Sequence, residues 1–238
     1  MDKDKVMRRP ALLVLVRHAE SLRNEAKKGS TYFADDDARS KVVGIPDHKI
    51  DLTEAGWEHA LRLGSKIRER FGVFDYAYTS GYLRTNRTRE GILQAYTNEE
   101  REKIELRQRM QIRERDPGYT YDMTEEEVET NFPYLRKYWE TFGGFMAAPP
   151  GGESLAQMCS RVELFLDMIF RTKPRQKVLV VTHGGTIRCF RALLEHWEYD
   201  QAEKWPPGQS PKNCGVTTYQ FDPFTNRLEL REYNEVLA

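Results

Sequence analysis

Short apolar runs alternate along this chain with longer segments in which apolar residues recur every three or four positions. The short runs have the length of buried strands, and they lie at residues 11–16, 75–79 and 178–181. The longer segments have the period of amphipathic helices, and they begin near Thr53, Leu83, Ser154 and Ile187. Thr53 and Ser154 are good N-cap residues, and Gly72 is a suitable stop for the helix that follows Thr53. The stripe of the last helix extends as far as Trp197.

This order of elements predicts the fold class. Strands that alternate with helices indicate a three-layer α/β/α sandwich around a mainly parallel sheet. Two further apolar segments, at 216–221 and 228–233, flank a turn with Pro and Asn and predict a terminal hairpin. We expect a single domain over residues 1–238.

Residues of about 90–150 interrupt the alternation, first with a highly charged stretch and then with an aromatic-rich one between Tyr119 and Phe145. We interpret the whole segment as an insertion that forms a lid over the carboxyl ends of the strands. We expect its aromatic side chains to form the insertion's own core rather than a surface for substrate.

Composition narrows the function classes. The 238 residues contain 37 Lys and Arg and 37 Asp and Glu, so an overall attraction to nucleic acid or to an anionic membrane is not expected. No apolar run approaches the roughly 18 residues of a membrane span, and the charged start does not resemble a secretory signal. Cys159, Cys189 and Cys214 are widely spaced, which favours a reducing cytoplasm and argues against zinc or a disulfide framework. Oligomeric state stays open.

Polar residues follow three of the predicted strands directly. Arg17 and His18 end the first, Arg84 stands near the start of the helix after the second, and His183 with Gly184 and a further glycine follows the third. Parallel sheets bind ligands at this edge, and a glycine-rich helix start suits an anion. Any one of these residues would ordinarily be a solvated surface group, but three coincidences at one edge indicate a phosphate site. A neutral histidine beside phosphate is a candidate nucleophile.

Five separated segments also carry a family resemblance: "RHAESLRN", "LTEAGWEHA", "TSGYLRTNRT", "PGGES" and "VVTHGGTIR". In this order they resemble the histidine phosphatase superfamily, also called phosphoglycerate mutase-like, and they look most like its broad-specificity phosphatase branch. The resemblance implies that His18 is the nucleophile and that Arg17, Arg84 and His183 complete the phosphate pocket, with Asn24 as a further phosphate contact. Ala19 stands where the family's signature has glycine, a small change that we do not interpret as inactivating.

The resemblance also implies a general acid within "IRERDPG", where Glu114 is the candidate. Glu114 lies in so charged a stretch that, without the resemblance, a solvated face is the more probable interpretation. Glu20 in the signature is a second carboxylate there, usually structural in the family, and Asp116 and Asp122 are the next candidates for the acid.

Together these features predict a phosphatase that needs no metal or cofactor and hydrolyses a small phosphorylated substrate through a phosphohistidine. One alternative is phosphoryl transfer of the phosphoglycerate mutase type. Another is a catalytically idle phosphate-binding or regulatory module, which would have no chemical need for the full set of Arg17, His18, Arg84 and His183.

Overall fold

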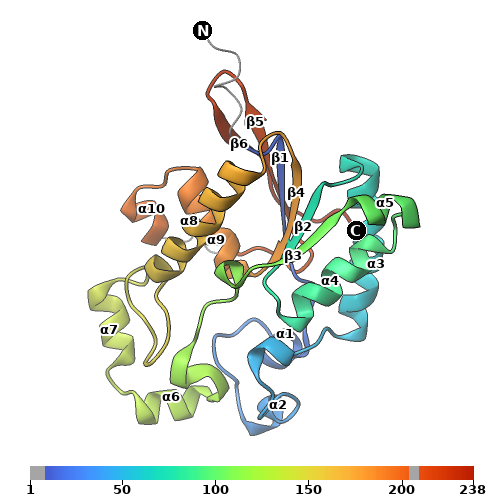
Figure 1. The fold of residues 1–238 in the computed structure, drawn as a ribbon. Coiled ribbons are helices and arrows are strands. Elements are labelled where there is room, and N and C mark those ends of the chain that lie inside the picture. Colours follow the sequence, from blue (N-terminus) through green and yellow to red (C-terminus); the bar gives the residue numbers. More distant parts are fainter. Residues whose placement is uncertain (1–8, 204–208) are drawn as a thin grey trace.

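One mixed sheet forms the centre of the molecule in the computed structural model, which describes residues 9–203 and 209–238 (Figure 1). Its strand order is β3-β2-β4-β1-β5-β6. The strands are β1 (Leu12–Arg17), β2 (Tyr76–Thr79), β3 (Glu105–Gln108), β4 (Lys177–Thr182), β5 (Val216–Asp222) and β6 (Arg227–Glu235). The first four in chain order pair in parallel, and β5 pairs antiparallel with β1 and β6. The α/β class and the terminal hairpin are therefore as expected.

The helices surround this sheet on both faces and at one end (Figure 1). The helices that cover the faces are α3 (Glu54–Phe71), α4 (Leu83–Leu93), α8 (Leu155–Thr172) and α9 (Gly184–Leu194). The shorter ones are α1 (Leu22–Lys27), α2 (Asp36–Ser40), η2 (Asp47–Lys49), α5 (Asn98–Lys103), η3 (Met110–Ile112), η4 (Gly118–Asp122), α6 (Glu125–Asn131), α7 (Leu135–Phe142) and α10 (Tyr199–Glu203). Helices α1, α2, α6 and α7 gather at the end of the sheet opposite the β5–β6 turn (Figure 1).

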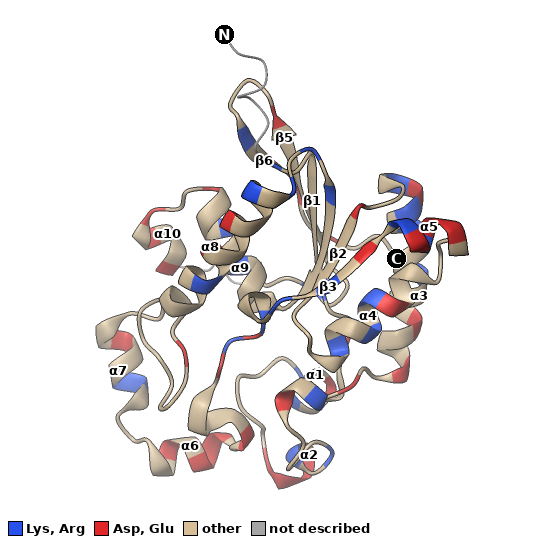
Figure 2. Cartoon of the chain, in the orientation of Figure 1, with Lys and Arg blue, Asp and Glu red and all other residues tan. Residues whose placement is uncertain are grey.

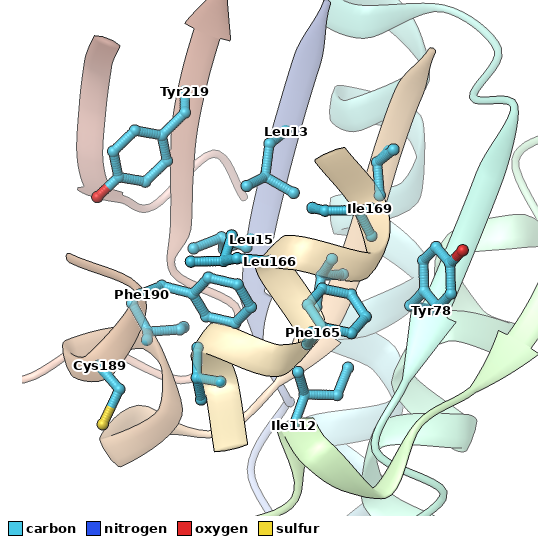
Figure 3. Packing of buried hydrophobic residues seen from close by; sticks show 14 of the residues in the cluster. Leu13, Leu15, Tyr78, Ile112, Phe165, Leu166, Ile169, Cys189, Phe190 and Tyr219 are labelled. Atoms are coloured by element: carbon cyan, nitrogen blue, oxygen red, sulfur yellow. The ribbon is translucent and has the colours of Figure 1, made fainter. Parts of the chain in front are cut away.

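The alternation of side chains along each strand creates two cores. Leu13 and Leu15 point toward α8 and α9, where they pack with Phe165 and Phe190 (Figure 3). Val180 belongs to the same cluster. The intervening strand residues point the opposite way and pack against α3 and α4; they include Val14, Val16, Leu179 and Val181. Each such side chain, fully buried, contributes about 1.5–3 kcal/mol of transfer free energy. The sheet is therefore held from both sides, and its strand ends are rigid supports.

Two glycines of α3 allow unusually close packing. A methyl group on Gly64 would lie 2.4 Å from the carbonyl oxygen of Ile92 in α4, and one on Gly56 would lie 2.2 Å from the carbonyl oxygen of Glu20. The caps expected for this helix are present, because Thr53 Oγ1 accepts a hydrogen bond from the Gly56 amide at 2.9 Å and Gly72 ends the helix. α3 thus supports the loop that follows β1.

Two boundaries differ from the sequence-based expectation. α9 ends at Leu194 rather than near Trp197, because His196 adopts a positive φ of 52°, which no α-helix accommodates. The segment assigned to the insertion, about 90–150, includes α5 and β3, and β3 adds a parallel strand beside β2. Three of the four β3 residues are exposed at the sheet edge, so its sequence lacks the apolar signal of a buried strand.

The aromatic residues of the insertion do not form its core, contrary to expectation. Tyr119 and Tyr134 are 72% and 79% exposed, and Phe142 is also exposed. Between Tyr119 and Phe145, the buried apolar residues are instead Val128 and Leu135.

No helix within the described residues is long and apolar enough to cross a membrane.

Candidate active site

Two histidines meet where β1 and β4 end. The strands pair in register, with Arg17 opposite Thr182, and the His18 amide donates to the Thr182 carbonyl at 2.8 Å. The next residue after each strand end is a histidine, so His18 and His183 are brought to an edge-to-face contact with ring centroids 5.1 Å apart. Both side chains are almost completely buried.

The ring of His18 is oriented by the backbone carbonyl of the next residue. Its Nδ1 lies 2.7 Å from the carbonyl oxygen of Ala19, and since a carbonyl only accepts, Nδ1 carries the proton. Nε2 therefore holds a lone pair, and it has no hydrogen-bond partner among the described residues. Burial, followed by the nearby guanidinium groups of Arg84 and Arg17, lowers the pKa of His18 well below its usual value. The ring is thus neutral near pH 7, as a nucleophile must be.

His183 is held through its other ring nitrogen, Nε2. Its Nε2 lies 2.9 Å from Ser80 Oγ, and its Nδ1 is buried without a hydrogen-bond partner. The closest carboxylate oxygen to Nδ1, Oε2 of Glu114, is 3.6 Å away. Burial, with help from Arg84, also lowers the pKa of His183 well below its usual value. Either tautomer of His183 fits this contact. The tautomer in which Ser80 donates to Nε2 places the ring proton on Nδ1, where it can bind an anion.

Two guanidinium groups stand beside the histidines. Arg84 is 4% exposed and is held by Asp47, whose two carboxylate oxygens lie 3.0 and 3.2 Å from its Nη1 and Nη2. Arg17 donates from Nη1 to the Pro211 carbonyl at 2.5 Å, while its Nε is buried without a partner. Arg17 thus has an unused buried donor and no carboxylate within ion-pair distance among the described residues.

Glu114 reaches this cluster from the segment after η3. Its side chain is 28% exposed, and its Oε1 accepts a hydrogen bond from the Arg115 amide at 2.9 Å. Desolvation raises the pKa of Glu114, although Arg84 opposes the shift. A carboxyl group with a raised pKa, beside a neutral histidine with a free lone pair, is suited to general acid–base work.

The segment that carries Glu114 is fixed by the fully buried side chain of Ile112, which packs in the same core as Phe165 and Phe190, and by polar contacts. Thr182 Oγ1 donates to the Ile112 carbonyl at 2.7 Å, and Thr186 Oγ1 donates to the Arg113 carbonyl at 2.9 Å. Arg161 of α8 donates to the Glu114 carbonyl at 3.1 Å. The end of β4 and the starts of α8 and α9 therefore all position the carboxyl group.

Arg161 is itself held by Glu153 of the "PGGES" loop. Nε and Nη2 of Arg161 lie 2.7 and 2.8 Å from the two carboxylate oxygens of Glu153, a bidentate pair of low exposure. The Glu153 amide donates to the Asp116 carbonyl at 2.9 Å. This loop, whose role the sequence left open, thus supports the Glu114 segment.

Asn24 of α1 also lines the cavity. Its Oδ1 accepts hydrogen bonds from Ser21 Oγ at 3.0 Å and from Asn213 Nδ2 at 3.2 Å. Asn213 also donates to the His18 carbonyl at 2.8 Å, so it links Asn24 to the first histidine. The Nδ2 group of Asn24 has no partner among the described residues and remains a free donor at the cavity wall.

Gly184 begins α9, directly after His183. A methyl group on Gly184 would meet Arg17 Nε at 3.6 Å, an ordinary contact, whereas one on Gly185 would lie 3.4 Å from Glu114 Oε1. Neither added methyl group would clash, and the two distances show how closely the start of α9 approaches Arg17 and Glu114. The unpaired amides at the start of this helix favour an anion at the same place.

A cavity of about 690 Å³ opens in front of these residues. Its wall includes Arg17, His18, Asn24, Arg84 and Glu114, together with α1 and the loop after it and with Tyr121 and Trp139 from the insertion. His183 lies behind it with no exposed surface. This volume is within the range of small-molecule sites.

His18, Glu114 and His183 also have potential metal-ligand atoms within 4.8 Å of one another. Two cationic side chains flank the set, and both lower the pKa values of the two histidines. That positive potential opposes a divalent cation and favours a phosphoryl group. The donor set therefore fits an oxyanion better than a metal.

Every residue of the expected phosphate pocket is thus brought to one place, and Glu114 joins it. The fallback candidates lie elsewhere: Asp116 Oδ1 accepts from the Gly118 amide in a turn, and Asp122 Oδ2 accepts from the Gly44 amide. Glu20 lines the cavity but accepts a hydrogen bond from Thr53 Oγ1 at 3.2 Å, a structural contact.

Several contributors were missed from the sequence: Asp47, Ser80, Asn213 and Arg161. Ser80 lies within the segment "TSGYLRTNRT", directly after a predicted strand, so its position was enough to single it out from the sequence. The other three act through contacts 37 to 195 residues away in sequence, which no local pattern reveals.

Comparison with known proteins gives a family match over nearly the whole chain. The family described as histidine phosphatase superfamily (branch 1) matches residues 13–234. A 2,3-bisphosphoglycerate-dependent phosphoglycerate mutase of Rhizobium etli is 32% identical, over 77% of this chain and 79% of that protein. The phosphoglycerate mutase-like protein AT74 of Arabidopsis thaliana is 29% identical over 82% of this chain, which spans only 60% of that relative.

Solved structures show the same fold. A mycobacterial glucosyl-3-phosphoglycerate phosphatase in complex with inorganic phosphate matches with a TM-score of 0.70 and 18% identity, covering 94% of this chain and 97% of the other. A putative alpha-ribazole-5'-P phosphatase from Escherichia coli K-12 matches with a TM-score of 0.73 and 18% identity, covering 95% and 97%.

Proposed function

The chain belongs to the histidine phosphatase superfamily (branch 1), a family of hydrolases and phosphotransferases, and from that premise we propose that it hydrolyses small phosphomonoesters through a phosphohistidine on His18. One observation carries the proposal. His18 has its Nδ1 tied to the Ala19 carbonyl, while its Nε2 lone pair is free beside Arg17 and Arg84. This arrangement is what in-line attack on a phosphorus atom requires.

In the first step, His18 Nε2 forms a bond to phosphorus while the bond from phosphorus to the ester oxygen breaks. Arg17, Arg84 and Asn24 bind the phosphoryl oxygens, and His183 Nδ1 donates to one of them. Protonated Glu114 gives its proton to the departing alkoxide. No metal is needed, because the guanidinium groups neutralise the transferring charge.

In the second step, the Glu114 carboxylate takes a proton from water, whose oxygen attacks phosphorus. The bond between phosphorus and Nε2 breaks, and inorganic phosphate leaves with neutral His18 restored. Atoms and charges balance over the cycle, which consumes one water molecule. The raised pKa of Glu114 suits it to both tasks, since it must be protonated first and ionised afterwards.

Phosphoryl transfer of the mutase type is the second candidate, favoured by the names of curated relatives such as the Rhizobium etli mutase. A mutase must keep water from its phosphohistidine until the phosphoryl group returns to substrate. The cavity, at about 690 Å³, is larger than a three-carbon substrate needs, and it leaves space that water can enter. This size is the reason why we favour hydrolysis over transfer.

We also place the protein in a reducing cytoplasm, a proposal that its three cysteines, all free and buried, support.

The test is to incubate the protein with 3-phosphoglycerate and with a panel of sugar and alkyl phosphates, and to measure free phosphate and phosphoglycerate isomers in the same samples. The proposal expects phosphate release to exceed isomer formation. Isomerisation that outpaces phosphate release would establish the mutase alternative. No reaction of either kind with any panel member, from folded protein, would favour the idle module.

A further inference from the structure

Two basic residues of α1 line the cavity without belonging to the phosphate pocket. Arg23 and Lys27 both contribute to the cavity wall, and they are four residues apart on one short helix. Residues at this spacing share a helix face, and like charges there destabilise a helix by about 0.2–0.5 kcal/mol. α1 also carries Asn24, so the helix contributes to the phosphate pocket and to this basic pair. Figure 2 shows that basic and acidic positions both occur on α1.

Neither cation is neutralised by an ion pair. Arg23 donates to the carbonyl of Tyr121, but its Nη1 is buried without a partner. Lys27 donates to the carbonyl of Thr31. No carboxylate of the described residues lies within 4.0 Å of either charged group, although Asp47 and Asp122 are near enough to interact with both at longer range.

The acids of the cavity wall have other partners. Asp47 holds Arg84, Glu25 pairs with Lys41, and Glu20 accepts from Thr53. Glu114 faces the histidines. Arg23 and Lys27 are therefore surplus cations in a partly desolvated site, an arrangement that an incoming anion would relieve.

Arg23 is also held in place before any ligand arrives. Its guanidinium lies 3.8 Å from the centroid of the Tyr121 ring and 5.0 Å from that of Phe33. Tyr121 is fixed in turn by a hydrogen bond of 2.8 Å from its hydroxyl to the Ile45 carbonyl. A donor group that is already oriented loses little conformational entropy on binding. Burial lowers the pKa of Lys27 to about 8, so the group is still mostly charged near pH 7, and an anion beside it would raise that pKa.

We infer that Arg23 and Lys27 form a second anion subsite, which selects phosphomonoesters whose leaving group bears a carboxylate or a second phosphate. The rise of an α-helix is 1.5 Å per residue, so Asn24 and Lys27 are offset by about 4.5 Å along α1. A small substrate spans that offset, with its reacting phosphate at His18 and its second anion at Arg23 and Lys27. This inference rests on the proposed function and specifies its substrate class.

The test compares matched substrates that differ only in the second anion. One pair is 3-phosphoglycerate and glycerol 3-phosphate, in which a carboxylate replaces a hydroxymethyl group. Another is 1,3-propanediol bisphosphate and 3-hydroxypropyl phosphate. For the wild type, the ratio of kcat/KM for the anionic over the neutral member should exceed ten for at least one pair.

Arg23→Gln and Lys27→Gln should each lower that ratio, by about tenfold or more for Arg23→Gln, because a hydrogen bond to a charged group contributes about 1.5–3 kcal/mol. Arg23→Lys keeps the charge and should retain part of the preference. Lys66→Gln, which removes a positive charge from the exposed face of α3, is the matched control and should leave the ratio unchanged. A wild-type ratio of one or less for both pairs, or an unchanged ratio in both subsite variants, would overturn the inference.

Failure of the proposed function has a different signature. It would appear as phosphate release that does not depend on His18, with the neutral substrates as well as the anionic ones. In that case, calorimetric titration of folded His18→Asn with the same pairs still tests the subsite. Tighter binding of the anionic members, lost in the Arg23→Gln double variant, would support it, and equal Kd values would refute it.

Discussion

The ends of β1 and β4 are built alike and are held differently. The strands are register-paired neighbours, and each is followed by a buried histidine whose pKa is lowered by burial and by the same two arginines. His18 is tethered through Nδ1 to the carbonyl of the next residue, Ala19, which leaves Nε2 free. His183 is tethered through Nε2 to Ser80 in the next strand-end loop, which leaves Nδ1 free, 3.6 Å from Glu114. Under the proposed mechanism, the two tethers give the rings different roles, with His18 as the nucleophile and His183 as a donor to the transferring group.

Among the residues around the proposed nucleophile, the largest effect is expected at the carboxyl group that faces both histidines. Glu114→Gln should lower kcat/KM for alkyl phosphates by about 10²–10⁴, the range for loss of a general acid. Nitrophenyl phosphate should suffer less, because its leaving group needs little protonation. Steady-state rates on the two substrate types measure the difference, and Glu105→Gln and Glu125→Gln are the matched controls. Equal, mild losses in all three variants would show that Glu114 is only another charged residue.

The same residue should govern one limb of the pH profile. The pKa of Glu114 is raised, and it must be protonated in the first step, so kcat/KM should fall as pH rises through that pKa. The pKa of His18 is lowered, and its ring must be neutral, so the acid limb should lie well below pH 6.5. Glu114→Gln should remove the first limb and leave the second. An acid limb near pH 6.5 that reports on His18 would contradict the burial argument.

Replacing His183 should lower the rate less than replacing Glu114 does for substrates with poor leaving groups. The loss from replacing His183 should be the same for all substrates. His183→Gln removes one donor to the phosphoryl oxygens, which should cost about 10²-fold in kcat. Because the lost interaction is with the transferring group, nitrophenyl and alkyl phosphates should be affected alike. His196→Asn, at an exposed position with a positive φ that asparagine tolerates, is the control. If the effect of His183→Gln depended strongly on the leaving group, the general acid would be His183 rather than Glu114.

Loss of the tether alone should have a smaller effect. Ser80→Ala removes the hydrogen bond that orients His183, and one neutral hydrogen bond contributes about 1 kcal/mol, or roughly fivefold in rate. Ser160→Ala, on the exposed side of α8, should change nothing. A Ser80→Ala variant with wild-type kcat would mean that His183 needs no orientation by Ser80.

Chelation should have the smallest effect of all. The two arginines favour an oxyanion over a cation at His18, Glu114 and His183, so EDTA should leave the rate within experimental error. Complete loss with EDTA, restored by Mg²⁺ or Zn²⁺, would assign the three residues to a metal site instead.

The same contrast between strand ends and other regions explains what the sequence could reveal. Residues at strand ends are predictable, because an apolar run, its length and the next polar residue are all local. Arg17, His18, Arg84 and His183 were found in this way. The tethers were not, because Asp47 reaches Arg84 from 37 residues away, and Asn213 reaches His18 from 195 away.

The insertion is the region that the sequence predicted least well. Its aromatic residues were expected to form a core, but Tyr119 and Tyr134 are exposed, and its inner segment is held by hydrogen bonds from Thr182, Thr186 and Arg161. Apart from the buried Ile112, this segment is held by polar contacts to distant elements, and one apolar residue gives no hydrophobic period to detect. Glu114 therefore needed the family resemblance to be singled out within its charged stretch.

The central claim is that Nε2 of His18 carries the phosphoryl group, and trapping the intermediate tests it most directly. Wild-type protein is mixed with substrate, quenched in alkali, and mapped by mass spectrometry, with folded His18→Asn as the control. The account predicts one phosphate, stable in alkali and labile in acid, on His18 and absent from the variant. A phosphate found on His183 or on any other residue, or turnover that persists in His18→Asn, would contradict it.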